Sequence, residues 1–184
     1  MPCINNPVFY NGAFYCLDYN GMLGVFSLEG GVSWKVLSKS LKQFSGFYPS
    51  YLVECDEKLL LVNIGQSGKL VEIHRLDDEE MVWVKLNSLG KRALFINYTS
   101  SFSAVAPRSC MENNIYFPKL YAEKVLYYSL DTCRYRSVGS HQHSSQDFHR
   151  TKERSNCTWI EPNWSLASIF IESDFSCFPF KSQY

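Results

Sequence analysis

The residues best suited to chemistry lie in the polar segment 139–157, which holds three histidines and a cysteine. Imidazole nitrogens and thiolates are ligands that zinc prefers, and this segment supplies four of them, at His141, His143, His149 and Cys157. Their spacing, H-x-H-x5-H-x7-C, matches no common structural zinc pattern. The surrounding serines and glutamines are typical of a solvated loop. We therefore interpret these side chains as loop residues and predict neither a metal nor a cofactor.

Nucleophile and phosphate-binding motifs are the next candidates, and none is complete. Ser109 and Cys110 lack the flanking glycines and the strand-to-helix turn of a nucleophile elbow. The glycines form neither a G-x-x-x-x-G-K-[ST] string nor a G-x-G-x-x-G string, so no phosphate loop is expected. Asp56 and Asp131 occupy matching turn positions and are interpreted as turn residues rather than as an acid pair. The sequence thus predicts no catalytic residues.

Two short charge runs remain open to interpretation. Arg150, Lys152 and Arg154 form a basic run that is typical of a solvated linker, with a localisation signal or a binding patch as the alternatives. The acidic run 77–80 lies between two expected strands. A charged hairpin loop that keeps a sheet edge soluble explains it, and contact with a basic partner is the alternative. Neither run identifies a partner, so the partner-binding residues stay unassigned.

The composition describes a folded chain without excess charge. The 184 residues suffice for one domain, and 46% of them are hydrophobic. Lys and Arg total 18, as do Asp and Glu, so the net charge is zero and nucleic-acid binding through bulk charge is disfavoured. Aromatic residues make up 16% of the chain. Because aromatic side chains favour pleated sheets over helices, we expect an all-β protein.

Three features of the sequence predict the compartment: the N-terminal segment, the length of the apolar stretches and the cysteines. The segment 1–7 has neither the basic nor the apolar region of a secretory signal peptide. No stretch reaches the roughly 18 apolar residues of a membrane span. The seven cysteines, an odd number without a C-x-x-C pair, are typical of reduced thiols. We expect a protein of the cytoplasm or the nucleus that contacts no membrane.

The elements that would position any site are short strands joined by tight turns. Strands expected at 8–10, 13–18 and 22–28 are separated by Asn-Gly pairs, which favour two-residue hairpins because both residues tolerate positive φ. A closing strand follows, with Trp34 and Val36 on one face. The result is a four-stranded antiparallel meander.

The same order of elements returns twice. A first turn opens each unit, 45 and then 57 residues apart, at Asn11, Asp56 and Asn113. A large ring closes each unit 22 to 27 residues later, at Trp34, Trp83 and Tyr135. Core or inter-unit packing, rather than a carbohydrate platform, is expected of Tyr10, Tyr15, Trp34 and Trp83. A meander that repeats about every 40–50 residues is typical of β-propeller blades, and an antiparallel sandwich is the alternative.

Outside the strands, helical signals are sparse. The segment 38–44 could form one or two helical turns between units, and 165–171 is ambiguous between helix and strand.

Several stretches of the sequence, taken together and in their order along the chain, resemble those of a known family. The first two are VFYNGAFYCLDYNG from Val8 and YLVECDEKLLLV from Tyr51. The shorter ones are WVKL from Trp83, SLG from Ser88, ALFI from Ala93, NIYF from Asn114, YSLD from Tyr128 and WIEP from Trp159. In this order they resemble plant F-box proteins with a KIB-type, kelch-like β-propeller. The resemblance covers residues 5–163. It implies a partial propeller of about three four-stranded antiparallel blades plus a remnant, with a domain at 1–163, units at 5–40, 48–90 and 93–138, a remnant at 157–163 and a tail at 164–184.

The resemblance also implies a function. In that family an F-box docks on the Skp-type adaptor of a cullin ubiquitin ligase, and the propeller presents the substrate. This chain resembles the C-terminal half of a member, without the F-box. Because closed propellers have about 4–8 blades, three blades leave two faces exposed. We expect the chain to self-associate through them, to pair with another propeller fragment, or to be poorly stable. We expect a protein-interaction module with an unknown partner. The alternatives are a truncated product without independent activity and a propeller enzyme.

Overall fold

The computed structural model describes residues 7–18, 21–28, 32–37, 49–121, 124–138, 142–143, 152–153 and 159. Within these ranges the regular elements are β-strands and two single-turn 3-10 helices, η1 (Gln66–Gly68) and η2 (Ser109–Met111), and there is no α-helix. No helix in this part of the chain is long and apolar enough to cross a membrane. The segments 38–44 and 164–184, for which a helix and a tail were predicted, lie outside the described residues.

The first sheet follows the predicted meander, in the order β1-β2-β3-β4. Its strands are β1 (Val8–Tyr10), β2 (Ala13–Leu17), β3 (Leu23–Ser27) and β4 (Ser33–Leu37). Asn11 and Gly12 have φ angles of 45° and 76°, the left-handed backbone that a two-residue hairpin requires. The Asn-Gly pair therefore sets the register in which Tyr10 lies opposite Ala13.

The second sheet repeats this order as β5-β6-β7-β8. Its strands are β5 (Ser50–Glu54), β6 (Leu59–Ile64), β7 (Val71–Asp77) and β8 (Val82–Leu86). Asp56 and Glu57, with φ angles of 51° and 56°, form the predicted first turn. The acidic run 77–80 joins β7 to β8, where the Asp77 carboxylate accepts the Glu80 N–H at 3.1 Å. The prediction of a charged hairpin loop is confirmed.

The third sheet is larger than predicted. It contains β9 (Arg92–Phe95), β10 (Phe102–Val105), β11 (Asn114–Tyr121), β12 (Lys124–Ser129), β13 (Arg134–Ser137) and β14 (Gln142–His143), in the order β10-β9-β11-β12-β13-β14, and β15 (Lys152–Glu153) pairs with β11. The sequence predicted that β10 precedes β11 in a meander. Instead β9 lies between them and runs parallel to β11. Ala93 and Leu94 are buried completely, and such a continuous apolar run suits a strand in the interior of a sheet.

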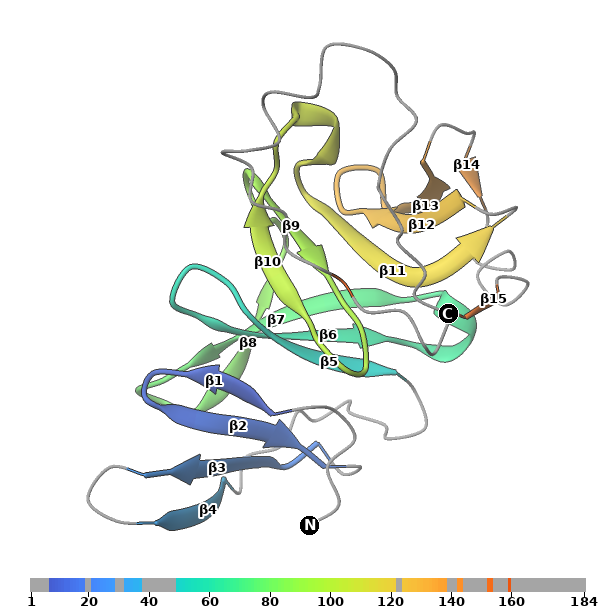
Figure 1. The fold of residues 1–184 in the computed structure, drawn as a ribbon. Helices are drawn as coiled ribbons and strands as arrows, with labels where there is room; N and C mark the ends of the chain where they lie inside the picture. The colour runs from blue at the N-terminus through green and yellow to red at the C-terminus, as the bar shows by residue number, and fades with distance from the viewer. Residues whose placement is uncertain are drawn as a thin grey trace.

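Each sheet packs one face against the next. Between the first and second sheets lies a cluster of Tyr10, Leu17, Leu23, Leu52, Leu59, Leu61 and Leu76. Between the second and third lies a larger cluster, which includes Tyr51, Val53, Val62, Ile73, Leu94, Ile115, Phe117 and Leu126. Figure 1 shows the sheets fanning outward from β1, β5 and β10, with β4 and β14 at opposite ends of the molecule. The predicted fold class is confirmed, since the structure is all-β and its sheets are arranged as in a partial β-propeller. Two of the sheets are four-stranded and antiparallel, and the third is the larger sheet with one parallel pair.

The closing aromatic residues occupy equivalent positions in the three sheets. Trp83 packs on the cluster shared with the first sheet, and Tyr135 is buried in the cluster shared with the second. Each ring thus faces the sheet that precedes its own. The register places Trp34 beside Phe26, on the face of the first sheet opposite to Leu17 and Leu23. Trp34 therefore has the same orientation but no preceding sheet among the described residues, and 47% of it is exposed.

Candidate functional site

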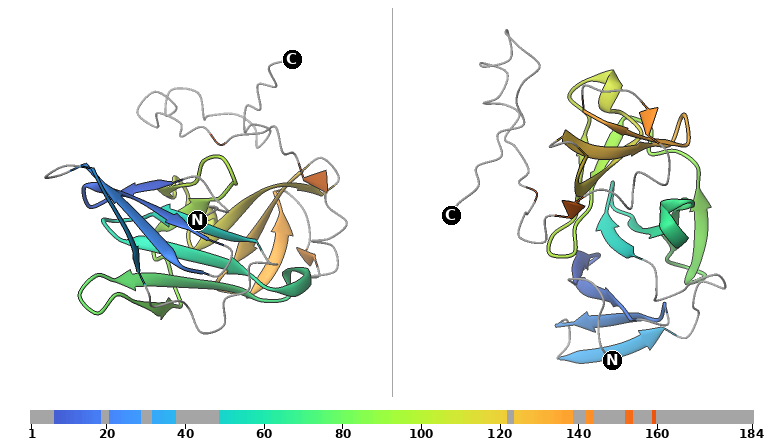
Figure 2. Two further views of the ribbon diagram at one scale, coloured as in Figure 1. Left: turned by 90° about the horizontal axis from the view of Figure 1, so that it is seen from below. Right: turned by 90° about the vertical axis from the view of Figure 1, so that its right-hand side faces the viewer.

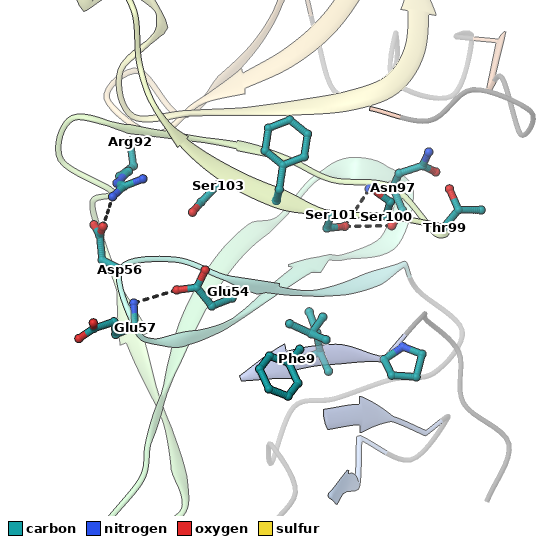
Figure 3. A pocket seen from close by; sticks show the side chains of 14 residues that line it. Phe9, Glu54, Asp56, Glu57, Arg92, Asn97, Thr99, Ser100, Ser101 and Ser103 are labelled. Carbon is teal, nitrogen blue, oxygen red and sulfur yellow. Dashed lines mark hydrogen bonds and ion pairs between the residues drawn. The ribbon is translucent and has the colours of Figure 1, made fainter. Parts of the chain in front are cut away.

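A groove of about 900 Å³ lies where β1, β5 and β10 meet. Each of the three is the edge strand of its sheet in the described part of the chain, and β5 contacts both β1 and β10. The groove therefore runs along the inner edges from which the sheets fan out (Figure 3). Its volume is in the range of sites that bind small molecules, roughly 300–1,000 Å³. This convergence makes the groove the candidate functional site.

One end of the groove is acidic. Glu54 ends β5, and the turn that follows it contributes Asp56 and Glu57. Arg92, at the start of β9, forms an ion pair with Asp56. The Glu54 side chain accepts the backbone N–H of Glu57 at 2.8 Å, and neither glutamate forms an ion pair with a described residue. Three carboxylates and one guanidinium give this end a net charge of −2, which attracts a cation.

The other end of the groove carries hydroxyl groups on a short loop. This loop joins β9 to β10 and supplies Asn97, Thr99, Ser100 and Ser101 (Figure 3). The Ser101 hydroxyl accepts the Asn97 N–H at 3.0 Å and donates to the Asn97 carbonyl at 3.0 Å. These two hydrogen bonds join the Ser101 side chain to the Asn97 backbone and so fix the conformation of the loop. The loop thus presents polar groups that can bind the amides of a polypeptide.

The wall between the two ends is apolar. Phe9 on β1, the buried Leu52 on β5 and Phe102 on β10 contribute to it. Phe9 is 59% exposed, whereas Phe102 stacks on Phe95 with ring centroids 5.0 Å apart. An exposed ring beside acidic and hydroxyl groups is the mixed lining typical of protein-binding surfaces.

Cys55 lies between the groove residues Glu54 and Asp56 in the sequence, and its thiol is a possible nucleophile. Cys55 lies directly after β5, and burial raises the pKa of its thiol. A hydrogen bond with the Ser103 side chain acts in the opposite direction but is the smaller effect. The thiol therefore stays protonated near neutral pH, when only the thiolate is a nucleophile.

The residues weighed as chemical candidates are dispersed in the structure. Ser109 and Cys110 lie in η2 and are exposed. Asp56 and Asp131 lie in separate turns, as predicted, and Asp131 accepts a hydrogen bond from Asn113 Nδ2 at 2.6 Å. Asp78 of the acidic run accepts a hydrogen bond from the Tyr10 hydroxyl at 2.5 Å, which ties the first sheet to the second.

The predicted loop histidines give no structural test. His141, His149 and Cys157 lie outside the described residues, and His143 lies in β14 without a described side chain. Arg150 and Arg154 of the basic run also lie outside them. Among the residues that the structure describes, no three of His, Cys, Asp and Glu lie close enough to hold a metal ion.

Sequence reasoning did not identify the groove residues. Glu54 and Glu57 flank a turn, and the serines follow a strand, so each has an ordinary local explanation. Their position in the repeat was the one signal that could have identified them, because each groove residue named here lies at or next to the first strand of a repeated unit. In a propeller-like arrangement the innermost strands meet at the centre.

Comparison with known proteins gives two matches. The sequence profile of the KIB1-4 β-propeller family matches residues 2–145. An F-box/kelch-repeat protein from Arabidopsis thaliana is 29% identical over 167 residues, which cover 86% of this chain. The chain spans 45% of the length of that relative. No solved structure matches the chain at a significant level.

Proposed function

Because the chain belongs to the KIB1-4 β-propeller family, we propose that it is a protein-interaction module whose binding site is the groove between β1, β5 and β10. The observation that carries this proposal is the convergence of three sheet edges on one groove with an acidic end, an apolar wall and a hydroxyl end. Edge strands present unpaired N–H and C=O groups to an incoming chain. The module has a binding role and no catalytic one.

The groove favours an extended polypeptide segment with a lysine or arginine. The cationic side chain lies between Glu54 and Glu57, neither of which is paired with a cation of the described chain. Its neighbouring side chain packs on Phe9, and its main chain reaches the loop hydroxyl groups. Charge complementarity of this kind sets specificity and the association rate more than affinity.

The name of the Arabidopsis relative suggests a context for this role. That relative carries the words F-box and kelch-repeat in its name. We propose that the bound polypeptide belongs to a protein that is selected for a ubiquitin ligase, in the cytoplasm or the nucleus. The thiols of Cys55, Cys110 and Cys133 are free, which is consistent with a reducing compartment. A second mode of interaction, self-association through an exposed sheet face, belongs to the same proposal.

The test compares two pools of fluorescent nonapeptides that differ only at the central residue, which is Lys or Arg in one pool and Asp or Glu in the other. Fluorescence anisotropy measures the binding of each pool to the full chain. We expect the cationic pool to bind more tightly. The double substitution Glu54→Gln and Glu57→Gln weakens that binding about 5- to 10-fold, since a part-exposed ion pair contributes up to about 1 kcal/mol.

Glu79→Gln is the matched control, because Glu79 is an exposed acid in the β7–β8 turn and does not line the groove. It removes one negative charge from the chain but none from the site, so binding of the cationic pool is unchanged. Equal binding of the two pools, or an equal loss in the control and in the groove variant, contradicts the proposed site.

A further inference from the structure

The backbone hydrogen-bonding groups of the edge strand β5 alternate in direction. Cys55 and Lys58 exchange two backbone hydrogen bonds, at 2.9 and 3.1 Å, and the Ile64 N–H donates to the Pro49 carbonyl at 2.9 Å. These bonds show that positions 49 and 55 are hydrogen-bonded toward β6. Because hydrogen-bonded and non-hydrogen-bonded positions alternate in an antiparallel ladder, positions 51 and 53 also bond to β6. Positions 50, 52 and 54 direct their N–H and C=O groups to the opposite edge.

Leu52 and Glu54 therefore present backbone groups to the groove, which both residues line. Among the described residues β5 pairs with β6 alone, and no backbone hydrogen bond joins Leu52 or Glu54 to a turn or loop there. In a β-propeller the sheets surround a central channel, so a neighbouring sheet packs on the face of a sheet while its inner edge faces the channel. The edge of β5 thus offers donors and acceptors to an incoming chain.

Of the three inner strands, β5 is the best placed to receive such a chain. Figure 2 shows the second sheet between the first and the third, so β5 has an inner strand on each side. β1 is only three residues long, and Pro7, the residue before it, has no N–H. β10 meets β5 at the acidic end of the groove, where the Ser103 side chain is hydrogen-bonded to the Cys55 thiol. A chain paired with β5 is therefore flanked by β1 and β10.

We propose that the groove holds its polypeptide by strand addition, in which an extended segment of the partner pairs antiparallel with β5 and exchanges hydrogen bonds with Leu52 and Glu54. The inference rests on the binding role of the groove proposed above and adds the way in which the segment is held. Main-chain hydrogen bonds of this kind supply affinity, and the side chains at alternate positions supply specificity. The segment is antiparallel because that pairing is the more stable one per residue.

The cationic side chain of the segment lies directly opposite Glu54. Side chains at opposite positions of an antiparallel pair have Cβ atoms about 4.5–5.5 Å apart, which is within reach of an ion pair. Glu54 forms no ion pair with a described residue, whereas the neighbouring acid Asp56 is paired with Arg92. Glu54 is thus the acid that fixes the register of the segment.

Alternation along β5 then determines the other side chains of the segment. Leu52 packs in the cluster between the first and second sheets, whereas Val53 packs in the cluster between the second and third. The segment residue opposite Leu52 therefore points toward the first sheet, as the cation does, and the residue opposite Val53 points toward the third. On that side β10 supplies Ser101 and Ser103. Along the segment, the preferred order is a cation, a small polar residue and an apolar residue.

The probe is the fluorescent nonapeptide Val-Ser-Val-Ser-Lys-Ser-Val-Ser-Val, whose centre carries this order, and fluorescence anisotropy measures its binding to the full chain. N-methylation of the lysine, or of the valine two positions after it, removes an N–H that faces β5. We expect each methyl group to weaken binding about 10-fold, because it removes a hydrogen bond at the paired edge. The serine between them directs its N–H away from β5, so its N-methylation is the matched control and leaves binding unchanged.

A variant of the chain tests whether β5 is the strand that receives the segment. Glu54→Pro removes the outward N–H as well as the carboxylate, and proline is tolerated on edge strands where the N–H faces away from the sheet. Glu54→Gln removes the charge alone. We expect Glu54→Pro to bind the probe about 5- to 10-fold more weakly than Glu54→Gln does. Circular dichroism checks that both variants keep their β-structure.

The outcomes separate the mode of binding from the role of the groove. An equal loss at the lysine, the serine and the valine overturns strand addition, and a loss at the serine alone overturns the antiparallel register. Equal binding by Glu54→Pro and Glu54→Gln overturns the choice of β5. If the cationic pool binds and the probe does not, the preferred order of side chains is wrong. If neither binds, the binding role of the groove fails, and this inference fails with it.

Discussion

Asn113 is the residue whose replacement best tests how the third sheet is held to the second. It is buried, and its φ angle is +57°. Its side-chain oxygen accepts the buried N–H of Leu89 at 2.8 Å and lies 3.4 Å from the Ser88 hydroxyl. Its amide nitrogen donates to the Asp131 carboxylate at 2.6 Å. One side chain thus connects the segment after β8 with the turn between β12 and β13.

The cost of losing this side chain can be worked out bond by bond. Asn113→Gly keeps the positive φ free of strain and removes all three contacts. The orphaned Leu89 N–H costs about 1–3 kcal/mol, and loss of the bond to a carboxylate costs about 1.5 kcal/mol. We expect Asn113→Gly to lower the free energy of unfolding by about 3–4 kcal/mol. Asn113→Ala adds about 1 kcal/mol, because its Cβ is strained at this φ angle.

Urea unfolding followed by circular dichroism measures both variants against the parent chain. The order of stability, parent above Gly above Ala, separates the hydrogen-bond loss from the backbone strain. A change below about 1 kcal/mol for Asn113→Gly would refute the reasoning, since it would mean that water replaces the buried partners at no cost.

Three further predictions concern pH and packing. Burial raises the pKa of Tyr128 to about 12 and also raises the pKa of Tyr135, whose hydroxyl donates to the Gly68 carbonyl at 2.9 Å. Their neutral forms stabilise the fold below the unfolded pKa of about 10, so the urea midpoint falls as the pH rises from 10 toward 12. A constant midpoint over that interval contradicts this. Burial lowers the pKa of His74, whose Nδ1 has no hydrogen-bond partner in the described structure. Its neutral form stabilises the fold above the unfolded pKa of about 6.5, and this contribution is lost as the pH falls below that value. His74→Leu therefore unfolds with a smaller acid dependence than the parent, and an unchanged dependence would exclude His74 as its source. A Cβ at Gly24 would lie 2.5 Å from the Trp34 ring. Gly24→Ala therefore displaces Trp34, lowers stability by about 1–2 kcal/mol and changes the tryptophan fluorescence, whereas an unchanged spectrum would show that the ring does not cover Gly24.

Local signals in the sequence predicted most of the strands. Asn11-Gly12 and Asp56-Glu57 form the expected turns, since Asn, Gly and Asp adopt positive φ angles more readily than other residues do. The position of β9 could not be predicted in this way. The short apolar run from Ala93 to Phe95 is the same whether the strand lies at an edge or in the interior of a sheet. The parallel pairing of β9 with β11 joins residues 21 positions apart in the chain, such as Ala93 and Asn114.

The candidate site could not be predicted from the sequence, for a similar reason. Glu54 and Ser100 lie 46 residues apart in the chain, and only the meeting of β5 and β10 brings them to one groove. Trp34 and Trp83 show the same limit in packing. Both close a four-stranded unit and both lie on the face that points away from the following sheet, yet Trp83 is covered and Trp34 is not. The sequence pattern determines the orientation of a ring, whereas its burial depends on a neighbour that the local pattern does not contain.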